Sequence, residues 1–245
     1  MRRFLVVLLI FVVWFSCAGP LRATPGLHGS SGLIRIPTAY TLSQGEVDAA
    51  VDMYWLRRAG SLPDVRFIHS RLVTGLLEEG DHGVELGLHR VDITDAPGSA
   101  TAITGKYRFP GKLQLGALAL GGRVNVAGPS QNTIYVVGST NAAKVFAVHY
   151  GLGLNFSTAQ GLFSLGGGKD RNLQSDHLYA MFGAEMDLWD TVKVNADYNG
   201  DTVAYGVNWY PVESLVVSVF WIGSGEMERA YDGHNGLGFG VTAQF

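Results

Sequence analysis

The stretch VKVNADYNGDTVAYGVNWY (residues 192–210) decides the fold, because it consists of two alternating runs around a turn. Apolar residues occupy every second position on both sides of Asn199-Gly200, and polar or small residues fill the places between. A period of two is that of a β-strand, and Asn-Gly between two such runs is the strongest short signal for a β-hairpin. The stretch therefore predicts two antiparallel strands, each with one apolar face and one polar or small face.

The same alternation recurs over most of the chain and predicts about twelve strands. Their expected ranges are 46–57, 65–77, 83–92, 101–109, 112–124, 132–139, 144–156, 176–188, 191–199, 202–210, 214–224 and 234–245. The connections alternate in length, as in barrels that have short turns on one side and longer loops on the other. Short connections are expected at 110–111, 141–143, 189–190 and 211–213, and longer ones at 58–64, 93–100, 125–131, 157–175 and 225–233. Ten strands are the alternative, if the range 65–77 is a loop excursion.

Alternation by itself fits two architectures, because it does not say what covers the apolar faces. In a soluble β-sandwich these faces meet in the middle, whereas in a transmembrane barrel they face lipid and the polar faces line the lumen. Aromatic residues gather near the ends of predicted strands, as at Tyr107 and Phe109 or Trp209 and Tyr210, which is typical of a membrane barrel. We therefore expect an all-β, transmembrane antiparallel barrel, with a soluble secreted β-sandwich binding module as the alternative.

The first residues predict export. A basic start at Arg2 and Arg3 is followed by an apolar run over 4–15 and then by a small residue at Ala23. That order is typical of a secretory signal peptide, because the apolar run is too short to span a bilayer. We expect residues 1–23 to be removed, with a cut after Ala18 as the alternative. Cys17 raises a lipoprotein alternative, although the residues before it fit a lipoprotein signal poorly.

Composition then excludes several classes of function. Without residues 1–23, Lys plus Arg falls from 18 to 15 against 21 acids, which gives a formal charge of −6 and no basic patch for nucleic acid. That part of the chain has no cysteine, so neither disulfides nor a thiolate metal site are expected. No His or carboxylate cluster has metal-ligand spacing, and the glycines at 166–168 depart from the spacing of a phosphate-binding loop. We expect no metal and no cofactor.

The last ten residues, GLGFGVTAQF, alternate strictly and finish on an aromatic. They resemble the C-terminal signal by which the barrel-assembly machinery recognises outer-membrane proteins. The residues that carry this likeness are Leu237, Phe239, Val241, Ala243 and Phe245. The resemblance implies the outer membrane of a Gram-negative bacterium as the location, with outer-membrane lipid and the barrel-assembly machinery as partners.

The stretch GSSGLIRIPTAYTLSQGEVDAA (residues 29–50) is similar to the start of the YjbH-like family of exopolysaccharide-associated outer-membrane proteins. The matching residues are Gly32, Leu33, Ile34, Pro37, Thr38, Ala39, Gly45 and Glu46. This chain is shorter than the large members of that family. The resemblance implies a part in producing or exporting surface polysaccharide, as a passage or a scaffold, with polysaccharide or its export proteins as partners. We expect an N-terminal periplasmic lead over 24–44, tucked against the mouth or into the end of a barrel over 45–245, with a mere linker as the alternative.

If the apolar faces look outward, a mixed set of charged and polar side chains faces the lumen. The candidates are Asp48, Asp52, Arg71, Glu85, His89, Lys106, Arg108, Glu185, Asp187, Lys193 and Asp197. A strongly selective pore would favour a ring of one sign, whereas mixed signs favour ion pairs that fill a narrow barrel. Lys193, for example, is expected across a short turn from Asp187 or Glu185.

We expect no enzymatic activity. Asp232 and His234 form an Asp-x-His pattern that could orient an imidazole as a general base, but this spacing is common. The sequence thus favours an outer-membrane β-barrel that takes part in surface polysaccharide production or export. The alternatives are a small general diffusion channel, a barrel hydrolase that uses Asp232 and His234, and the soluble binding module.

Overall fold

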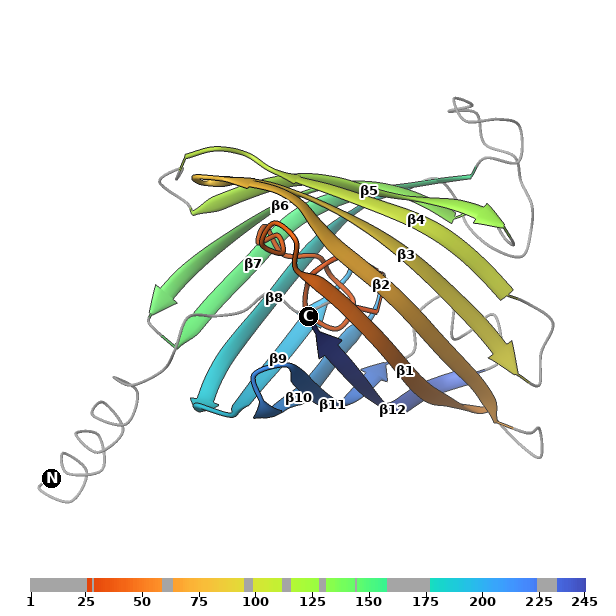
Figure 1. Ribbon diagram of the computed structural model, residues 1–245. Coiled ribbons are helices and arrows are strands. Elements are labelled where there is room, and N and C mark those ends of the chain that lie inside the picture. Colours follow the sequence, from red (N-terminus) through yellow and green to blue (C-terminus); the bar gives the residue numbers. More distant parts are fainter. Residues whose placement is uncertain are drawn as a thin grey trace, which may run out of the picture.

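The computed structural model describes residues 26–27, 29–58, 64–94, 99–111, 116–127, 131–143, 145–157, 177–223 and 233–245. Twelve antiparallel strands follow one another around a closed barrel, and β1 pairs with β12 to complete it (Figure 1). The strands are β1 (Val47–Arg58), β2 (Val65–Glu79), β3 (His82–Thr94), β4 (Ser99–Arg108), β5 (Ala117–Ala127), β6 (Gln131–Ala143), β7 (Phe146–Ser157), β8 (His177–Trp189), β9 (Val192–Tyr198), β10 (Val203–Val212), β11 (Leu215–Gly223) and β12 (Gly233–Gln244). Among the described residues, no helix is long and apolar enough to cross a membrane.

The hairpin expected around Asn199-Gly200 is present as β9 and β10. Val203 pairs with Tyr198, and the register continues to Trp209 opposite Val192. The Asn199 side chain accepts a hydrogen bond from the Thr202 backbone N–H at 2.9 Å, and Gly200 has a φ of 90°. A positive φ is easily adopted by glycine, so these two residues allow the chain to reverse within a few positions.

The barrel closes where its first and last strands meet. Val51 lies opposite Val241, and the backbones of Val47 and Phe245 exchange two hydrogen bonds of 3.0 and 2.9 Å. The start of β1 and the end of β12 therefore lie at the same end of the barrel, which we call the terminal end. The opposite end, which contains the β1–β2 and β9–β10 connections, is called the loop end.

The outer surface of the barrel is apolar and its interior is mostly polar. Leu178, Leu237 and Phe182 are 69%, 60% and 56% exposed, whereas the positions between such residues are buried. A sandwich would bury these apolar faces against each other, so the closed barrel with exposed apolar faces excludes that alternative. β2 is a complete strand, so the ten-stranded alternative is also wrong.

Strand bounds differ from the predicted ones mainly at bulges. Residues 141–143, predicted as a turn, belong to β6, and Pro211 and Val212 belong to β10. The register shifts between Asn141 and Ala143 and between Trp209 and Val212. A bulge changes which face each later side chain takes, so the alternation breaks although the ladder continues.

The N-terminal segment lies inside the barrel and fills its lumen (Figure 1). We call residues 26–46 the plug; His28 is outside the described residues. The expected lead was to occupy the mouth or the end of the barrel, but the plug reaches the middle of the strands, where Leu27 lies beside His69 of β2. Its apolar side chains are removed from water there, and this burial favours an inserted segment over an exposed linker.

Candidate functional site: the plugged lumen

A buried ion pair on β3 and β4 holds the first part of the plug. Glu85 and Lys106 are cross-strand partners, and Lys106 Nζ lies 3.1 Å from Glu85 Oε1. The Ser31 backbone N–H donates to Glu85 Oε1 at 2.9 Å, and the Ser31 hydroxyl donates to Glu85 Oε2 at 2.8 Å. Lys106 also donates to the carbonyls of Ser31 at 2.9 Å and Tyr40 at 2.5 Å. Both charges are thus compensated by each other and by the plug, as buried charges must be.

Asp197 of β9 receives the middle of the plug. The Arg35 backbone N–H donates to Asp197 Oδ2 at 2.8 Å, and the backbone N–H groups of Ile34 and Ile36 lie near this carboxylate. Successive backbone N–H groups that converge on one anion form a concave site with favourable electrostatics. One lumen carboxylate therefore holds the plug backbone at Arg35.

A chain of polar side chains crosses the opposite wall, from β6 to β9. The Ala39 backbone N–H donates to Ser139 Oγ at 2.7 Å, and Ser139 Oγ lies 2.8 Å from His149 Nδ1. His149 Nε2 is 3.5 Å from Glu185 Oε1, and Lys193 Nζ is 3.0 Å from Glu185 Oε2. The expected approach of Lys193 to Glu185 is confirmed. This series of side chains positions Ser139 Oγ to accept the hydrogen bond from the Ala39 backbone N–H of the plug.

Ser139, His149 and Glu185 are the residue types of a hydrolytic triad, but their setting favours a structural role. Ser139 is 1% exposed and its Oγ already accepts the Ala39 N–H. A nucleophile needs access to a substrate carbonyl and nearby oxyanion donors. Here the plug backbone occupies the position that a substrate would need.

Two apolar clusters fix the plug between opposite walls. Toward the loop end, Leu27 and Ile34 pack with Tyr54, Phe67 and Phe220 of the wall. On the other side, the cluster consists of Leu33, Ile36, Ala39, Ala119, Tyr135, Val137 and Met181. Lumen walls in barrels are usually polar, so apolar patches that face the interior need an apolar partner. The plug supplies that partner on both sides.

Hydrogen bonds from β2 and β4 hold the beginning of the plug. Thr104 Oγ1 donates to the Gly29 carbonyl at 3.0 Å, and His69 Nδ1 lies 3.2 Å from the Leu27 carbonyl. The His69 and His89 rings are stacked, with Nδ1 of the first 3.0 Å from Nε2 of the second. Gly29 has a φ of 91°, and an added Cβ there would collide with the His89 side chain. The plug therefore needs a glycine where it passes this wall.

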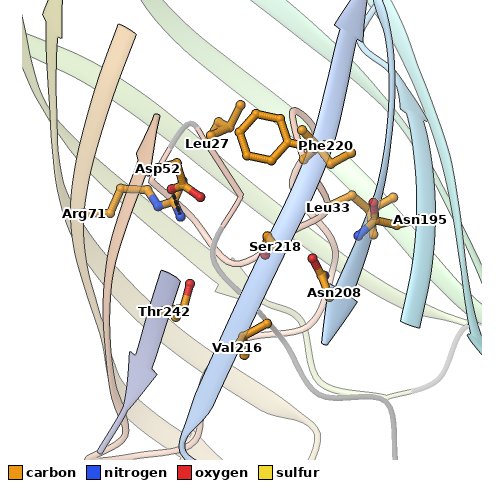
Figure 2. Close-up of a pocket in the computed structure, with 11 residues that line it drawn as sticks. Leu27, Leu33, Asp52, Arg71, Asn195, Asn208, Val216, Ser218, Phe220 and Thr242 are labelled. Carbon is orange, nitrogen blue, oxygen red and sulfur yellow. Dashed lines mark ion pairs between the residues drawn. The ribbon is translucent and has the colours of Figure 1, made fainter. Parts of the chain in front are cut away.

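A small cavity of about 30 Å³ remains between the plug and the wall formed by β10, β11 and β12 (Figure 2). Its lining consists of Leu27, Leu33, Ile34, Asp52, Arg71, Asn195, Asn208, Val216, Ser218, Phe220 and Thr242. Asp52 and Arg71 form an ion pair within this lining. Since one water occupies about 10–15 Å³ on this measure, the cavity has room for about two. We call it the side chamber.

The structure places nine of the eleven lumen candidates in the buried interior. They are Asp48, Asp52, Arg71, Glu85, His89, Lys106, Glu185, Lys193 and Asp197. Arg108 and Asp187 are partly buried near the terminal end, where Arg108 Nη2 lies 3.6 Å from Glu78 and Lys193 lies 4.0 Å from Asp187. In the expected assembly signal, Leu237, Phe239, Val241 and Phe245 are exposed on the outer face. Asp232 and the side chain of His234 lie outside the described residues.

Sequence reasoning missed Ser31, Ser139 and the inward-facing Phe220. The signal available for Phe220 was a local one: Val216, Ser218 and Phe220 lie on the inner face of β11, between outward-facing Val217 and Val219. An aromatic residue at an inward-facing position of a barrel strand indicates an apolar partner inside the lumen. Within the part of the chain that the structure describes, no group of three or more His, Cys, Asp or Glu residues could hold a metal ion.

No family model and no curated protein matches the chain. Several solved structures do. A COG4313 outer membrane channel from Pseudomonas putida F1 has a TM-score of 0.58 and 10% identity over 86% of this chain and 100% of its own. A KdgM porin has a TM-score of 0.51 and 11% identity over 80% and 99%. Outer membrane phospholipase A from Escherichia coli has a TM-score of 0.52 and 10% identity over 86% and 94%.

The protein is an outer-membrane β-barrel. Its strand number, closure and apolar outer face match those of barrels in that membrane, and the solved structures share the fold. At about one residue in ten, the identity shows the fold alone. The plug and its wall contacts are features of this chain's own residues.

Proposed function

We propose that the barrel takes part in surface polysaccharide production or export, as a passage that the plug closes at rest. The observation that supports this is where the YjbH-like resemblance lies. Six of its eight matching residues lie in the buried part of the plug, and the other two, Gly45 and Glu46, lie at its end next to β1. The six buried ones are Gly32, Leu33, Ile34, Pro37, Thr38 and Ala39. The likeness therefore falls on residues with a common physical task, which is to fill a lumen and bind its wall.

Gly32 illustrates why this segment tolerates little change. An added Cβ at this position would collide with the backbone of Ile36 and Pro37, because residues 32–37 form a tight loop closed by a bridge between Gly32 and Pro37. The Leu33 backbone N–H donates to the Ile36 carbonyl at 2.9 Å within this loop. The compact loop lets the Arg35 backbone N–H reach Asp197 and two apolar side chains reach the β5–β8 wall.

The proposal includes the expected surroundings of the barrel. The terminal end, with its short turns, faces the periplasm, and the apolar outer face contacts outer-membrane lipid. The barrel-assembly machinery inserts the protein, and polysaccharide or its export proteins are the functional partners. The protein is not an enzyme in this proposal, and it acts without cofactor or metal.

The test compares surface polysaccharide in a strain that lacks the protein with the same strain complemented by defined variants. Wild-type protein should restore the amount of polysaccharide. A variant with Ala39→Cys and Ser139→Cys, oxidised to fix the plug to β6, should fail to restore it and should recover on reduction. Each single-cysteine variant is the matched control. If the strain without the protein makes normal polysaccharide, the proposed role is wrong; if the oxidised variant restores it, the barrel is a scaffold.

A small general diffusion channel is the second candidate, because two of the solved structures that share the fold are named as a porin and a channel. In this case the barrel would conduct small ions without any polysaccharide phenotype. Recordings in planar bilayers discriminate the two. The plugged lumen predicts little conductance for the wild-type protein, and a large steady conductance would favour the diffusion channel.

A further inference from the structure

The plug contacts the barrel wall through hydrogen bonds and through apolar side chains. Its hydrogen bonds described above run to β2, β3, β4, β6 and β9, through residues such as Glu85, Lys106, Ser139 and Asp197. Toward β10 and β11, Leu27 and Ile34 pack in a cluster with Phe220, and the side chamber lies beside this contact (Figure 2). Where a cavity separates the plug from the wall, a solute can pass with the least displacement of the plug.

The inner face of β12 leaves room for side chains of the neighbouring strands. Its buried positions are Gly236, Gly238, Gly240, Thr242 and Gln244, so three of the five carry no side chain. An added Cβ at Gly240 would collide with Asp52, and one at Gly238 would collide with the ring of Phe220. The glycines therefore allow these two side chains to lie flat across β12 and form the walls of the chamber.

The chamber contains buried polar atoms that have no protein partner. Nε and Nη1 of Arg71 and Oδ1 of Asn195 make no hydrogen bond to described residues, although these residues are only 5% and 7% exposed. Such atoms are nearly always satisfied by water or by a ligand. Asn208 and Thr242 add further amide and hydroxyl groups to the lining. The arrangement fits water, or an uncharged solute of similar size that donates and accepts hydrogen bonds.

Apolar side chains close the chamber toward the loop end. Ser218 faces inward and is partly exposed, whereas Val216 and Thr242 of the same lining are buried. Toward the loop end, Leu27 and Phe220 meet, and behind them the Tyr54 ring stacks on Phe67 with centroids 4.7 Å apart. A constriction of apolar side chains excludes water and so blocks ions and polar solutes.

We propose that the side chamber is an entry site for uncharged polar solutes little larger than water, with Leu27 and Phe220 as the constriction that closes it. The class of solute follows from the lining, in which amides and hydroxyls provide hydrogen bonds and the charges of Asp52 and Arg71 compensate each other. This inference does not depend on the polysaccharide role, because it concerns a space that persists with the plug in place.

Thiol accessibility tests whether water-soluble reagents enter the chamber. Ser218→Cys and Ser139→Cys both place a thiol on the inner wall, one in the chamber and one under the plug. A small uncharged methanethiosulfonate reagent, added to full-length protein in native outer membranes, should modify Cys at 218 at least about tenfold faster, because the thiol at 139 reacts only after local opening. The unsubstituted protein gives the background, and heat-dependent gel mobility shows that each variant is folded. Equal rates at the two positions, or no reaction at 218, would overturn the proposal.

Ion flow tests the constriction and the charge pair. Phe220→Ala should raise the conductance in planar bilayers several-fold, whereas Tyr135→Ala, which removes a buried ring on the other wall, should not. Adding Asp52→Asn to Phe220→Ala leaves Arg71 uncompensated and should shift the reversal potential in a KCl gradient toward that of chloride. Adding Arg71→Gln instead should shift it toward that of potassium. A silent Phe220→Ala variant, or a reversal potential that ignores both charge changes, would show that the path lies elsewhere.

Discussion

Replacing Lys106 by methionine should release the plug, because this side chain joins the plug to the barrel most directly. Its ammonium group pairs with Glu85 and donates to the carbonyls of Ser31, Thr38 and Tyr40. Methionine keeps the length of the side chain and removes its charge. Glu85 is 1% exposed, so it would be left as a buried carboxylate without a cationic partner.

The size of the effect follows from that uncompensated charge. Breaking a buried ion pair from one side costs about 3–5 kcal/mol. When the plug leaves, water reaches Glu85 and relieves most of this cost, so the penalty falls mainly on the plugged state. Since every 1.4 kcal/mol is a factor of ten, about 3 kcal/mol would raise the ratio of open to plugged barrel about a hundredfold.

Trypsin measures this ratio, because the plug contains its own cleavage site. Arg35 is 8% exposed and its backbone N–H is bound to Asp197, so the bond between Arg35 and Ile36 is cut only when the plug has left. If opening is fast relative to cleavage, the rate of cleavage tracks the open fraction. Mass spectrometry of folded protein should show this cut about a hundredfold faster in Lys106→Met than in the wild type.

Two further variants separate charge compensation from general damage. Arg90→Met removes an exposed ion pair with Asp92, whose worth is about 0–1 kcal/mol, and should leave the cut at Arg35 unchanged. Glu85→Gln combined with Lys106→Met removes both charges. Trypsin should cleave this double variant at Arg35 more slowly than Lys106→Met alone, because the effects of two coupled residues do not add. If Lys106→Met is cut no faster than the wild type, the ion pair does not hold the plug.

Three other expectations concern single contacts. Asp197→Asn removes the charge that the Arg35 N–H binds, so amide hydrogen exchange of Arg35 should accelerate while exchange in β9 stays slow. Uniform acceleration would contradict the specific role of this carboxylate. Leu152 of β7 is 54% exposed and faces outward, so Leu152→Arg places a charge in the lipid and should destabilise the folded barrel by about 2–4 kcal/mol near the bilayer centre. Heat-modifiability gels should show a reduced folded fraction for this variant and a normal one for Leu152→Met. Burial first, and then the charge of Glu185, raises the pKa of the Tyr40 hydroxyl above its usual value of 10.0. The neutral hydroxyl donates to Asn141 at 2.8 Å. The stability that neutral Tyr40 gives to the plugged state is therefore complete below pH 10 and is lost as the pH rises through the raised pKa. The trypsin cut at Arg35 should accelerate in that range, and Tyr40→Phe should remove the pH dependence.

The strand pattern was predictable because its causes are local. Alternation gave the faces of β9 and β10, and Asn199-Gly200 gave the turn between them. The approach of Lys193 to Glu185 was predictable for the same reason, since a short turn brings neighbouring strands into a register. Bulges were not predictable, because a single extra residue looks like the end of a strand when only the period is known.

The location of the plug was not predictable from these rules. Ser31 binds Glu85 across 54 positions in the chain, and Arg35 binds Asp197 across 162. No periodicity connects residues at such separations. The segment has neither the alternation of a strand nor the spacing of a helix, so its apolar residues indicated burial without saying where. The apolar partner of the inward-facing Phe220 is Leu27 of the plug, which is far from it in the sequence.

Hydrogen exchange of the plug amides in the folded wild-type protein tests the central claim most directly. In the structure, the backbone N–H groups of Ser31, Arg35 and Ala39 are bonded to Glu85, Asp197 and Ser139 in the lumen. The account predicts that these amides exchange as slowly as those of the central strands, because exchange requires the plug to leave the barrel. Complete exchange of the segment within seconds, while the strands stay protected, would show that the lumen is not filled by residues 26–46.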